Sequence, residues 1–373
     1  MRILLAFDKF KGSLSASQIS EIVAAALTRK WPEAEILISP IADGGEGFTD
    51  AMMSVNQGEW REAAITDAQG RARVSRYGVI ERQGHLEAVM EMSAASGLAM
   101  VKDLPLNPHT ASTRGTGEMM KHALDHGAQR ILIGIGGSAT NDGGCGMASA
   151  LGCRFYDADG FEVTDLPANL EKVQRIDASA MPKCEVVVAC DVDNPLLGAK
   201  GASRVYGPQK GVTDVEFFDR RLAHLADLVQ RDLGCDHRAV SGAGAAGGLG
   251  FGLLSFCGAE LQNGFDIVAD ITDLKAKIES VDLVLTGEGR MDDQTLHGKG
   301  PHGVALMARE LGKKVVGIAG MIHSRGALET FFDGLVQVKP EDMGTEEAIA
   351  KAASLLEETV ALRADWLKEV ASK

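Results

Sequence analysis

The chain has 373 residues, of which 45% are hydrophobic and 24% charged, and its formal net charge at pH 7 is −14. This length exceeds what one compact core usually holds, so we expect two domains. The acidic balance excludes nonspecific binding to nucleic acid and to anionic membranes, because both need a basic face.

The N-terminal elements follow the order strand, helix, strand, helix. Residues 2–7 form an apolar strand, and Ser15 with Gln18 forms a capping box at the start of the next helix. A second strand is expected over 35–39 and a second helix over 47–55. This alternation predicts a parallel sheet with helices on its faces.

The middle of the chain does not show this regular alternation of strands and helices. Two segments joined near Gln83-Gly84 predict a hairpin, and two all-apolar runs predict buried strands. The expected strands are 71–81, 85–92, 131–135 and 186–190, and the expected helices are 118–126 and 217–233.

The C-terminal part returns to alternating strands and helices. We expect strands over 281–285, 314–319 and 335–338, and helices over 302–311, 327–332 and 345–366. The two ends of the chain therefore share a doubly wound α/β sheet. This predicts one domain from residues 1–62 plus 277–373, and an inserted mixed α/β domain from residues 63–276.

Glycine-dense segments that also carry acids or amides are the strongest functional signal. They cover residues 42–47, 134–144, 242–248 and 286–290. Glycine lets a backbone approach a ligand closely, and consecutive N–H groups at a turn or a helix start bind anions. The segments therefore predict a phosphate or carboxylate ligand.

One of these segments matches a known fingerprint only weakly. Gly242 to Gly247 reads G-x-G-x-x-G, but residues 235–238 before it make a poor strand, which disfavours an NAD site. Two interpretations remain open: a helix start near Gly247 that holds a phosphate, or a glycine-rich helix packed tightly on a neighbour. No Walker motif occurs in the sequence.

Four acids follow predicted strands: Asp8, Asp142, Asp191 and Glu288. One such acid is often only a helix cap, but four beside glycine, lysine or asparagine favour Mg²⁺ and phosphoryl transfer. Arg114 lies among hydroxyls and glycines, where a guanidinium can bind a carboxylate bidentately.

Taken together, these motifs resemble the signatures of bacterial glycerate kinases of the type-1 family, in order and over nearly the whole chain. The matching segments are 8–16, 42–47, 113–118, 133–144, 190–196, 201–211, 242–248 and 286–290. Lys9 and Gly12 depart from the Ser and Glu expected in the first segment, so we assign no role to position 12.

The resemblance implies ATP- and Mg²⁺-dependent phosphorylation of D-glycerate, with 2-phosphoglycerate favoured as the product. It also implies two α/β domains, one of them flavodoxin-like, with the active site in the cleft between them.

We assign hypothetical roles to the motif residues on this basis. Asp191 is the base or the acid that orients the hydroxyl, with Asn194 beside it, and Arg114 and Lys210 bind the carboxylate or the moving phosphoryl group. The predicted ATP contacts are Gly136, Gly137, Ser138, Gly242, Gly244, Gly247, Gly248, Lys11 and Lys299. The predicted Mg²⁺ ligands are Asp43, Asp142 and Glu288.

Two other classes stay open: an NAD-dependent dehydrogenase of a small hydroxy acid, and a non-catalytic protein that binds an anionic metabolite. The six cysteines show no zinc spacing and no long apolar run occurs, so we expect a cytoplasmic protein with reduced thiols. The expected partner is a small molecule, with no nucleic acid or membrane, and a homodimer is an open alternative.

Overall fold

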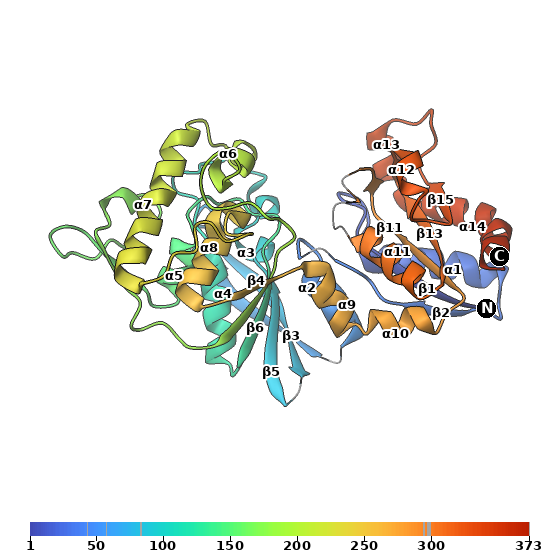
Figure 1. The fold of residues 1–373 in the computed structure, drawn as a ribbon, viewed down its shortest axis with the longest axis horizontal. Coiled ribbons are helices and arrows are strands. Elements are labelled where there is room, and N and C mark those ends of the chain that lie inside the picture. Colours follow the sequence, from blue (N-terminus) through green and yellow to red (C-terminus); the bar gives the residue numbers. More distant parts are fainter. Residues whose placement is uncertain (43, 57, 83, 294, 297–299, 373) are drawn as a thin grey trace. The chain divides into compact units, whose positions relative to one another are not determined.

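The computed structural model describes residues 1–42, 44–56, 58–82, 84–293, 295–296 and 300–372. The chain divides into two compact units (Figure 1). Unit 1 comprises Met1–Asp43, Asp50–Asn56 and Phe265–Lys373, and unit 2 comprises Gly44–Thr49 and Gln57–Gly264. The predicted α/β class is confirmed.

Unit 1 is built on a five-stranded sheet in the order β15-β13-β11-β1-β2, in which every pair is parallel. Its strands are β1 (Arg2–Phe7), β2 (Glu35–Ile38), β11 (Leu283–Gly287), β13 (Lys314–Ala319) and β15 (Gly334–Gln337). The sheet therefore joins strands from both ends of the chain, as the sequence predicts.

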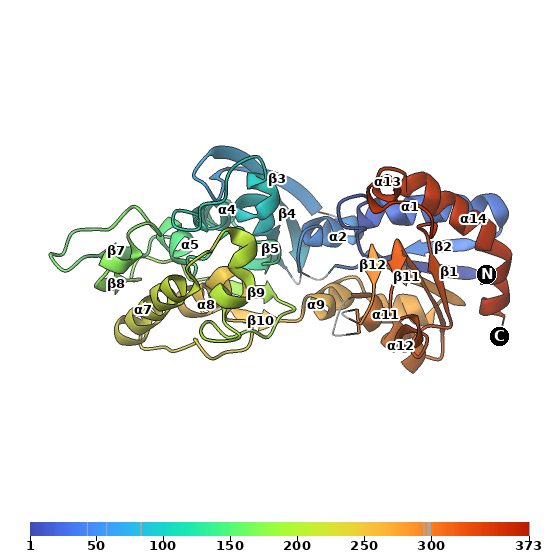
Figure 2. The same ribbon diagram turned by 90° about the horizontal axis from the view of Figure 1, so that it is seen from above.

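Helices cover both faces of this sheet, and the side chains of β1 alternate between the two cores. Ile3, Leu5 and Phe7 belong to one core, with residues of α1 (Ala16–Lys30) and α14 (Ala352–Ala371). Leu4 and Ala6 belong to another, with residues of α10 (Leu274–Glu279), α11 (Gly300–Glu310) and α12 (Arg325–Leu328). Figure 2 shows α1 and α14 on one side of β1 and α11 and α12 on the other.

The ends of two predicted helices can be checked in detail. The capping box of α1 is confirmed, because Gln18 N donates to Ser15 Oγ (3.2 Å) and Ser15 N donates to Gln18 Oε1 (2.9 Å). The single C-terminal helix predicted over 345–366 is wrong. It is α13 (Thr345–Ala350) and α14, separated at Lys351. Only α14 buries apolar residues, so only α14 is held by the core.

Unit 2 contains a six-stranded mixed sheet in the order β10-β9-β6-β5-β4-β3. Strands β3, β4 and β5 are antiparallel neighbours, whereas β5, β6, β9 and β10 run parallel. The predicted hairpin is confirmed as β4 and β5. The strands are β3 (Gly58–Thr66), β4 (Ala72–Arg82), β5 (His85–Glu91), β6 (Arg130–Gly134), β9 (Glu185–Ala189) and β10 (Glu260–Gln262).

The other elements of unit 2 are short except for three helices. The longer helices are α4 (Arg114–Asp125), α7 (Val215–Leu233) and α8 (Ala245–Cys257). The short elements are α3 (Ser93–Ser96), η1 (Leu98–Val101), α5 (Cys145–Ala150), β7 (Arg154–Tyr156), η2 (Leu170–Lys172), β8 (Arg175–Asp177), α6 (Ala202–Tyr206) and η3 (Pro208–Lys210).

In unit 1, β12 (Arg290–Met291) pairs with β14 (Met321–Ile322).

Helix α4 begins four residues earlier than the predicted start at Glu118. Gly115 and Gly117 weaken the helical pattern in the sequence, but both pack against neighbouring backbone in the structure. Arg114 is therefore the first helical residue and not part of the preceding loop.

The predicted domain limits and the units differ at a few segments. Residues 58–62 lie in β3, which pairs with β4 along its length and belongs to unit 2. Helices α2 (Phe48–Val55) and α9 (Gly264–Ile271) each include residues of both units. Whether the units are independent domains stays a prediction. No described helix is long and apolar enough to cross a membrane.

Candidate functional site

Two of the glycine-rich segments in unit 2 pack directly against each other. Gly143 N donates to Gly247 O at 3.1 Å, and a Cβ at Gly247 would lie only 1.9 Å from Thr140 O. A Cβ at Gly248 would lie 2.9 Å from Gly143 Cα. These glycines are therefore required for close backbone packing, which was one of the two open interpretations. Their contact with ATP phosphates stays a prediction.

The backbone at the start of α8 shows why the G-x-G-x-x-G match at Gly242 to Gly247 is not a dinucleotide site. Ala246, Gly247 and Gly248 have φ values of 54°, 69° and 87°, so regular helix begins only after them. The element before this segment is α7 and not a strand, so the context of a dinucleotide fingerprint is missing.

Asp142 is the most constrained acid of the predicted set. Its side chain is fully buried, and it accepts hydrogen bonds from Thr113 N and Oγ1 (both 2.8 Å), Gly144 N (3.1 Å) and Gly146 N (3.3 Å). Burial raises the pKa of Asp142, and the hydrogen bonds from Thr113, Gly144 and Gly146 oppose this rise.

This bonding favours a structural role for Asp142 over the predicted role as a Mg²⁺ ligand. Oδ2 accepts three of these bonds, so a metal ion on that oxygen would have to displace donors in the protein interior. The same bonds fix the residue before α4 and the first turn of α5, and thereby place Arg114.

Lys210 is a buried cation that contacts the same loop. Its Nζ donates to Ser138 Oγ (3.0 Å) and Thr140 O (2.7 Å), and its side chain is almost completely buried. Ser138 Oγ in turn donates to Ala246 O at 3.2 Å. Burial lowers the pKa of Lys210 to about 7, opposed by the charge of Asp142. Three predicted ligand segments, at Ser138, Lys210 and Ala246, thus meet at one hydrogen-bond network.

The loop after β9 carries Asp191 and Asn194. Asp191 Oδ1 accepts from Gly264 N at 2.7 Å. Asn194 uses both ends of its amide within the protein: Nδ2 donates to Lys200 O (2.8 Å) and Oδ1 accepts from Tyr206 OH (2.5 Å). Asn194 O also accepts from Gly244 N at 2.8 Å, so this loop lies against the predicted ATP-binding segment.

Arg114 is half exposed, and Glu118 holds one edge of its guanidinium. Its Nε donates to Glu118 Oε1 at 3.0 Å. Within the described part of the chain, the structure gives no partner to Nη1 or Nη2. A guanidinium with both Nη groups available presents the fork that binds a carboxylate or phosphate bidentately.

Two of the predicted site residues that the structure describes, Lys11 and Glu288, lie in unit 1. Glu288 follows β11, and its Oε1 accepts from Thr295 Oγ1 at 2.8 Å. A Cβ at Gly289 would lie 3.1 Å from Lys11 N, so Lys11 and Glu288 lie at the same edge of the sheet. Asp43 and Lys299 lie outside the described residues. In the described ranges, no group of three or more His, Cys, Asp or Glu side chains could hold a metal ion.

The sequence analysis assigned no role to four buried polar residues of unit 2, three of which lie in the motif segments: Thr113, Asn141, Ser203 and Arg221. Asn141 Oδ1 accepts from Ser203 Oγ (3.2 Å), and Arg221 donates to Asn141 O (2.9 Å). Burial lowers the pKa of Arg221. The sequence did contain a signal for Arg221. It lies on the same face of α7 as Leu222 and Leu225, where an apolar residue is expected.

Comparisons with known proteins point to one family over nearly the whole chain. The model of the glycerate kinase family matches residues 3–368. The glycerate kinase of Bacillus subtilis is 42% identical over 96% of this chain and 96% of its own length. The glycerate 2-kinase of Escherichia coli is 41% identical, over 97% and 98%. A crystal structure described provisionally as glycerate kinase 2 from Salmonella typhimurium LT2 superposes with a TM-score of 0.87. It is 41% identical and covers all of both chains.

The packing at Gly247 predicts a large effect of a single methyl group. We expect Gly247→Ala to lower the free energy of unfolding by about 3 kcal/mol or more, because the new Cβ meets Thr140 O and the φ is positive. Gly234→Ala is the matched control: its φ is +73°, but no atom lies within 4 Å of the added Cβ. It should lose only about 1 kcal/mol. Urea unfolding of both variants tests this, and equal losses would contradict it.

Burial of Lys210 predicts a characteristic pH dependence of stability. Its amine binds a proton more weakly in the folded chain, with a pKa of about 7, than in the unfolded chain, where the value is near 10.5. The unfolded state therefore binds more protons across this window, and this group makes stability rise with pH by about 1 kcal/mol per unit. We expect Lys210→Met to remove that slope between pH 7 and 9, measured by urea unfolding, while the exposed Lys351→Met keeps it. Parallel curves for wild type and Lys210→Met would contradict the assignment.

Proposed function

The chain belongs to the glycerate kinase family, and from this premise we propose that it transfers the γ-phosphoryl group of ATP to a hydroxyl of D-glycerate. The family and its curated members show that the chain is a kinase. We further propose that the reaction requires Mg²⁺ and that the product is 2-phosphoglycerate. The full-length identity of 41% to a glycerate 2-kinase supports this choice of hydroxyl.

The structural observation that carries the proposal is the fork of Arg114. Glycerate is a small anion with one carboxylate and two hydroxyls, so its recognition needs a cation in a fixed orientation. Arg114 meets this need because Nε is held by Glu118, and no described residue pairs with either Nη group. We propose that Arg114 binds the carboxylate of glycerate or the phosphoryl group during transfer.

Lys210 is proposed as the second cation of the reaction. Its Nζ lies on Ser138 and Thr140, next to the glycine-rich turn at Gly136 and Gly137 that we assign to ATP. A phosphate at this turn would favour the charged form of an amine whose pKa is about 7. Lys210 would then neutralise charge without needing to move.

Asp191 is proposed as the base that accepts the hydroxyl proton, or as the acid that orients the hydroxyl. It follows the carboxyl end of β9, where ligands bind in open α/β sheets. Its Oδ1 is fixed by Gly264 N at 2.7 Å, which orients the carboxylate. Asn194 holds its own loop through Lys200 and Tyr206, so we propose that it shapes the site and does not touch the substrate.

Mg²⁺ bound with ATP would supply positive charge that neutralises the negative charge developing on the phosphates. Among the predicted ligands, Glu288 offers a carboxylate at the carboxyl end of a strand in unit 1, beside Lys11. Asp142 is disfavoured, because it is fully buried and Oδ2 alone accepts three hydrogen bonds from the protein. We therefore propose Glu288 and Asp43 as the residues that would hold the ion.

The two other classes that the sequence left open have lost their support. A dehydrogenase would need a dinucleotide fingerprint after a strand, and the G-x-G-x-x-G segment follows a helix. A non-catalytic sensor has no basis in a family of kinases. A cytoplasmic location and a homodimer remain predictions from the sequence.

³¹P NMR of the product tests the reaction and its position together. The protein is incubated with ATP, Mg²⁺ and D-glycerate, and we expect ADP and the resonance of 2-phosphoglycerate to appear. The Asp191→Asn variant tests the role of Asp191 separately. If Asp191 is the base, we expect kcat to fall by about 10²-fold. A 3-phosphoglycerate resonance would refute the position, and no ADP at all would refute the kinase reaction.

A further inference from the structure

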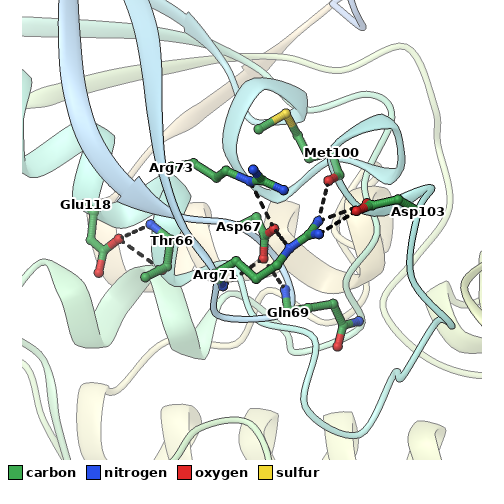
Figure 3. Close-up of polar contacts among 8 residues, drawn as sticks. All are labelled: Thr66, Asp67, Gln69, Arg71, Arg73, Met100, Asp103 and Glu118. Atoms are coloured by element: carbon green, nitrogen blue, oxygen red, sulfur yellow. Dashed lines mark hydrogen bonds and ion pairs between the residues drawn. The ribbon is translucent and has the colours of Figure 1, made fainter.

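The first turn of α4 is docked on the turn between β3 and β4. Ser112 N donates to Ala68 O at 2.9 Å, and a Cβ at Gly115 would lie 1.8 Å from Thr66 O. Only glycine permits this approach. Glu118, one turn later, accepts from Thr66 N (2.7 Å) and Thr66 Oγ1 (3.0 Å) through Oε2 (Figure 3).

The turn that receives α4 is itself pinned by a buried carboxylate. Asp67 Oδ1 accepts from Gln69 N (2.9 Å) and Arg71 N (3.0 Å), and Oδ2 accepts from Arg71 Nε (2.6 Å). Burial alone would raise the pKa of Asp67, but hydrogen bonds from Arg71 and Gln69 hold it below its ordinary value. We call residues 66–71 the Asp67 platform.

Arg71 extends the platform to a third segment. Figure 3 shows its guanidinium between Asp67 and Asp103, with Arg73 beside Asp67. Nη1 and Nη2 donate to the two oxygens of Asp103 at 2.7 and 3.1 Å, and Nη2 also donates to Met100 O at 2.8 Å. Side chains and backbone thus hold the platform from several directions, so it forms a fixed base for α4.

We propose that Glu118 is a positioning residue that holds the guanidinium of Arg114 for substrate. Its Oε2 is fixed to the Asp67 platform at Thr66, and its Oε1 accepts Arg114 Nε at 3.0 Å. The Nη fork is thereby left to the anion. This inference rests on the proposed function, in which Arg114 binds the carboxylate or phosphoryl group.

An ion pair four residues apart on an exposed helix face has little effect by itself. Lys121 and Asp125 on α4 form such a pair, with both side chains more than half exposed. Glu118 differs because its side chain is only 24% exposed and its second oxygen is bound to another strand. An arginine restrained in this way loses its rotamer freedom on folding, so less is lost when the ligand binds.

Glu118→Gln separates the two contacts of this carboxylate. The amide oxygen of Gln can still accept from Thr66 N, but its NH₂ group cannot accept from Arg114 Nε. We expect the KM for D-glycerate to rise about tenfold, since one charge-assisted hydrogen bond is lost. Lys121→Ala, the matched control, should leave the KM within about twofold of wild type.

A double-mutant cycle assigns the effect to Arg114. Arg114→Ala should lower kcat/KM by about 10- to 150-fold, and adding Glu118→Gln to it should change kcat/KM by less than about twofold. The melting temperatures of Glu118→Gln and Lys121→Ala should agree, which shows that the platform is intact.

Each outcome has a distinct meaning. If Arg114→Ala is impaired but Glu118→Gln equals wild type, the positioning role is refuted and the role of Arg114 stands. If Glu118→Gln is equally harmful with and without Arg114, the carboxylate acts on the fold and not through the guanidinium, and the proposal is again refuted. If Arg114→Ala itself has wild-type kinetics, Arg114 is not in the site. Both the proposed role of Arg114 and the positioning role of Glu118 are then refuted.

Discussion

The carboxylate of Asp142 is the constraint on which the site of unit 2 depends. It is fully buried and accepts four hydrogen bonds, from Thr113, Gly144 and Gly146. A buried carboxylate is tolerated only when such bonds replace water, and each bond is stronger in the interior than at the surface. By binding Thr113 it fixes the start of α4 and hence Arg114. By binding Gly144 and Gly146 it fixes the first turn of α5.

A second buried group extends this constraint to the rest of the cluster. Lys210 donates to Ser138 and to Thr140 O, in the loop that leads to Asp142. Ser138 reaches Ala246 O, and Gly143 donates to Gly247, so two glycine-rich segments form one packed body. Phosphoryl transfer benefits from donors and cations that need no rearrangement when charge develops. The donors and cations of a buried hydrogen-bond network are already held in place before any ligand binds.

The sequence predicted most strands of both sheets and the start of α1, because apolar runs, turn glycines and the capping box at Ser15 act locally. It predicted less about individual roles. Asp142 looks like any acid after a strand, and its partner Thr113 lies 29 residues away. Glycines that hold a phosphate and glycines that admit a neighbouring backbone also read alike, as Gly247 shows. Only tertiary packing separates these alternatives.

Unfolding of Asp142→Asn by urea in the absence of Mg²⁺ tests the anchoring role most directly. Asparagine places an NH₂ group against donors that now have no acceptor, so we expect the free energy of unfolding to fall by about 3 kcal/mol or more. A carboxylate kept for a metal would behave in the opposite way without the ion. Unchanged or increased stability of Asp142→Asn would therefore contradict the anchoring role.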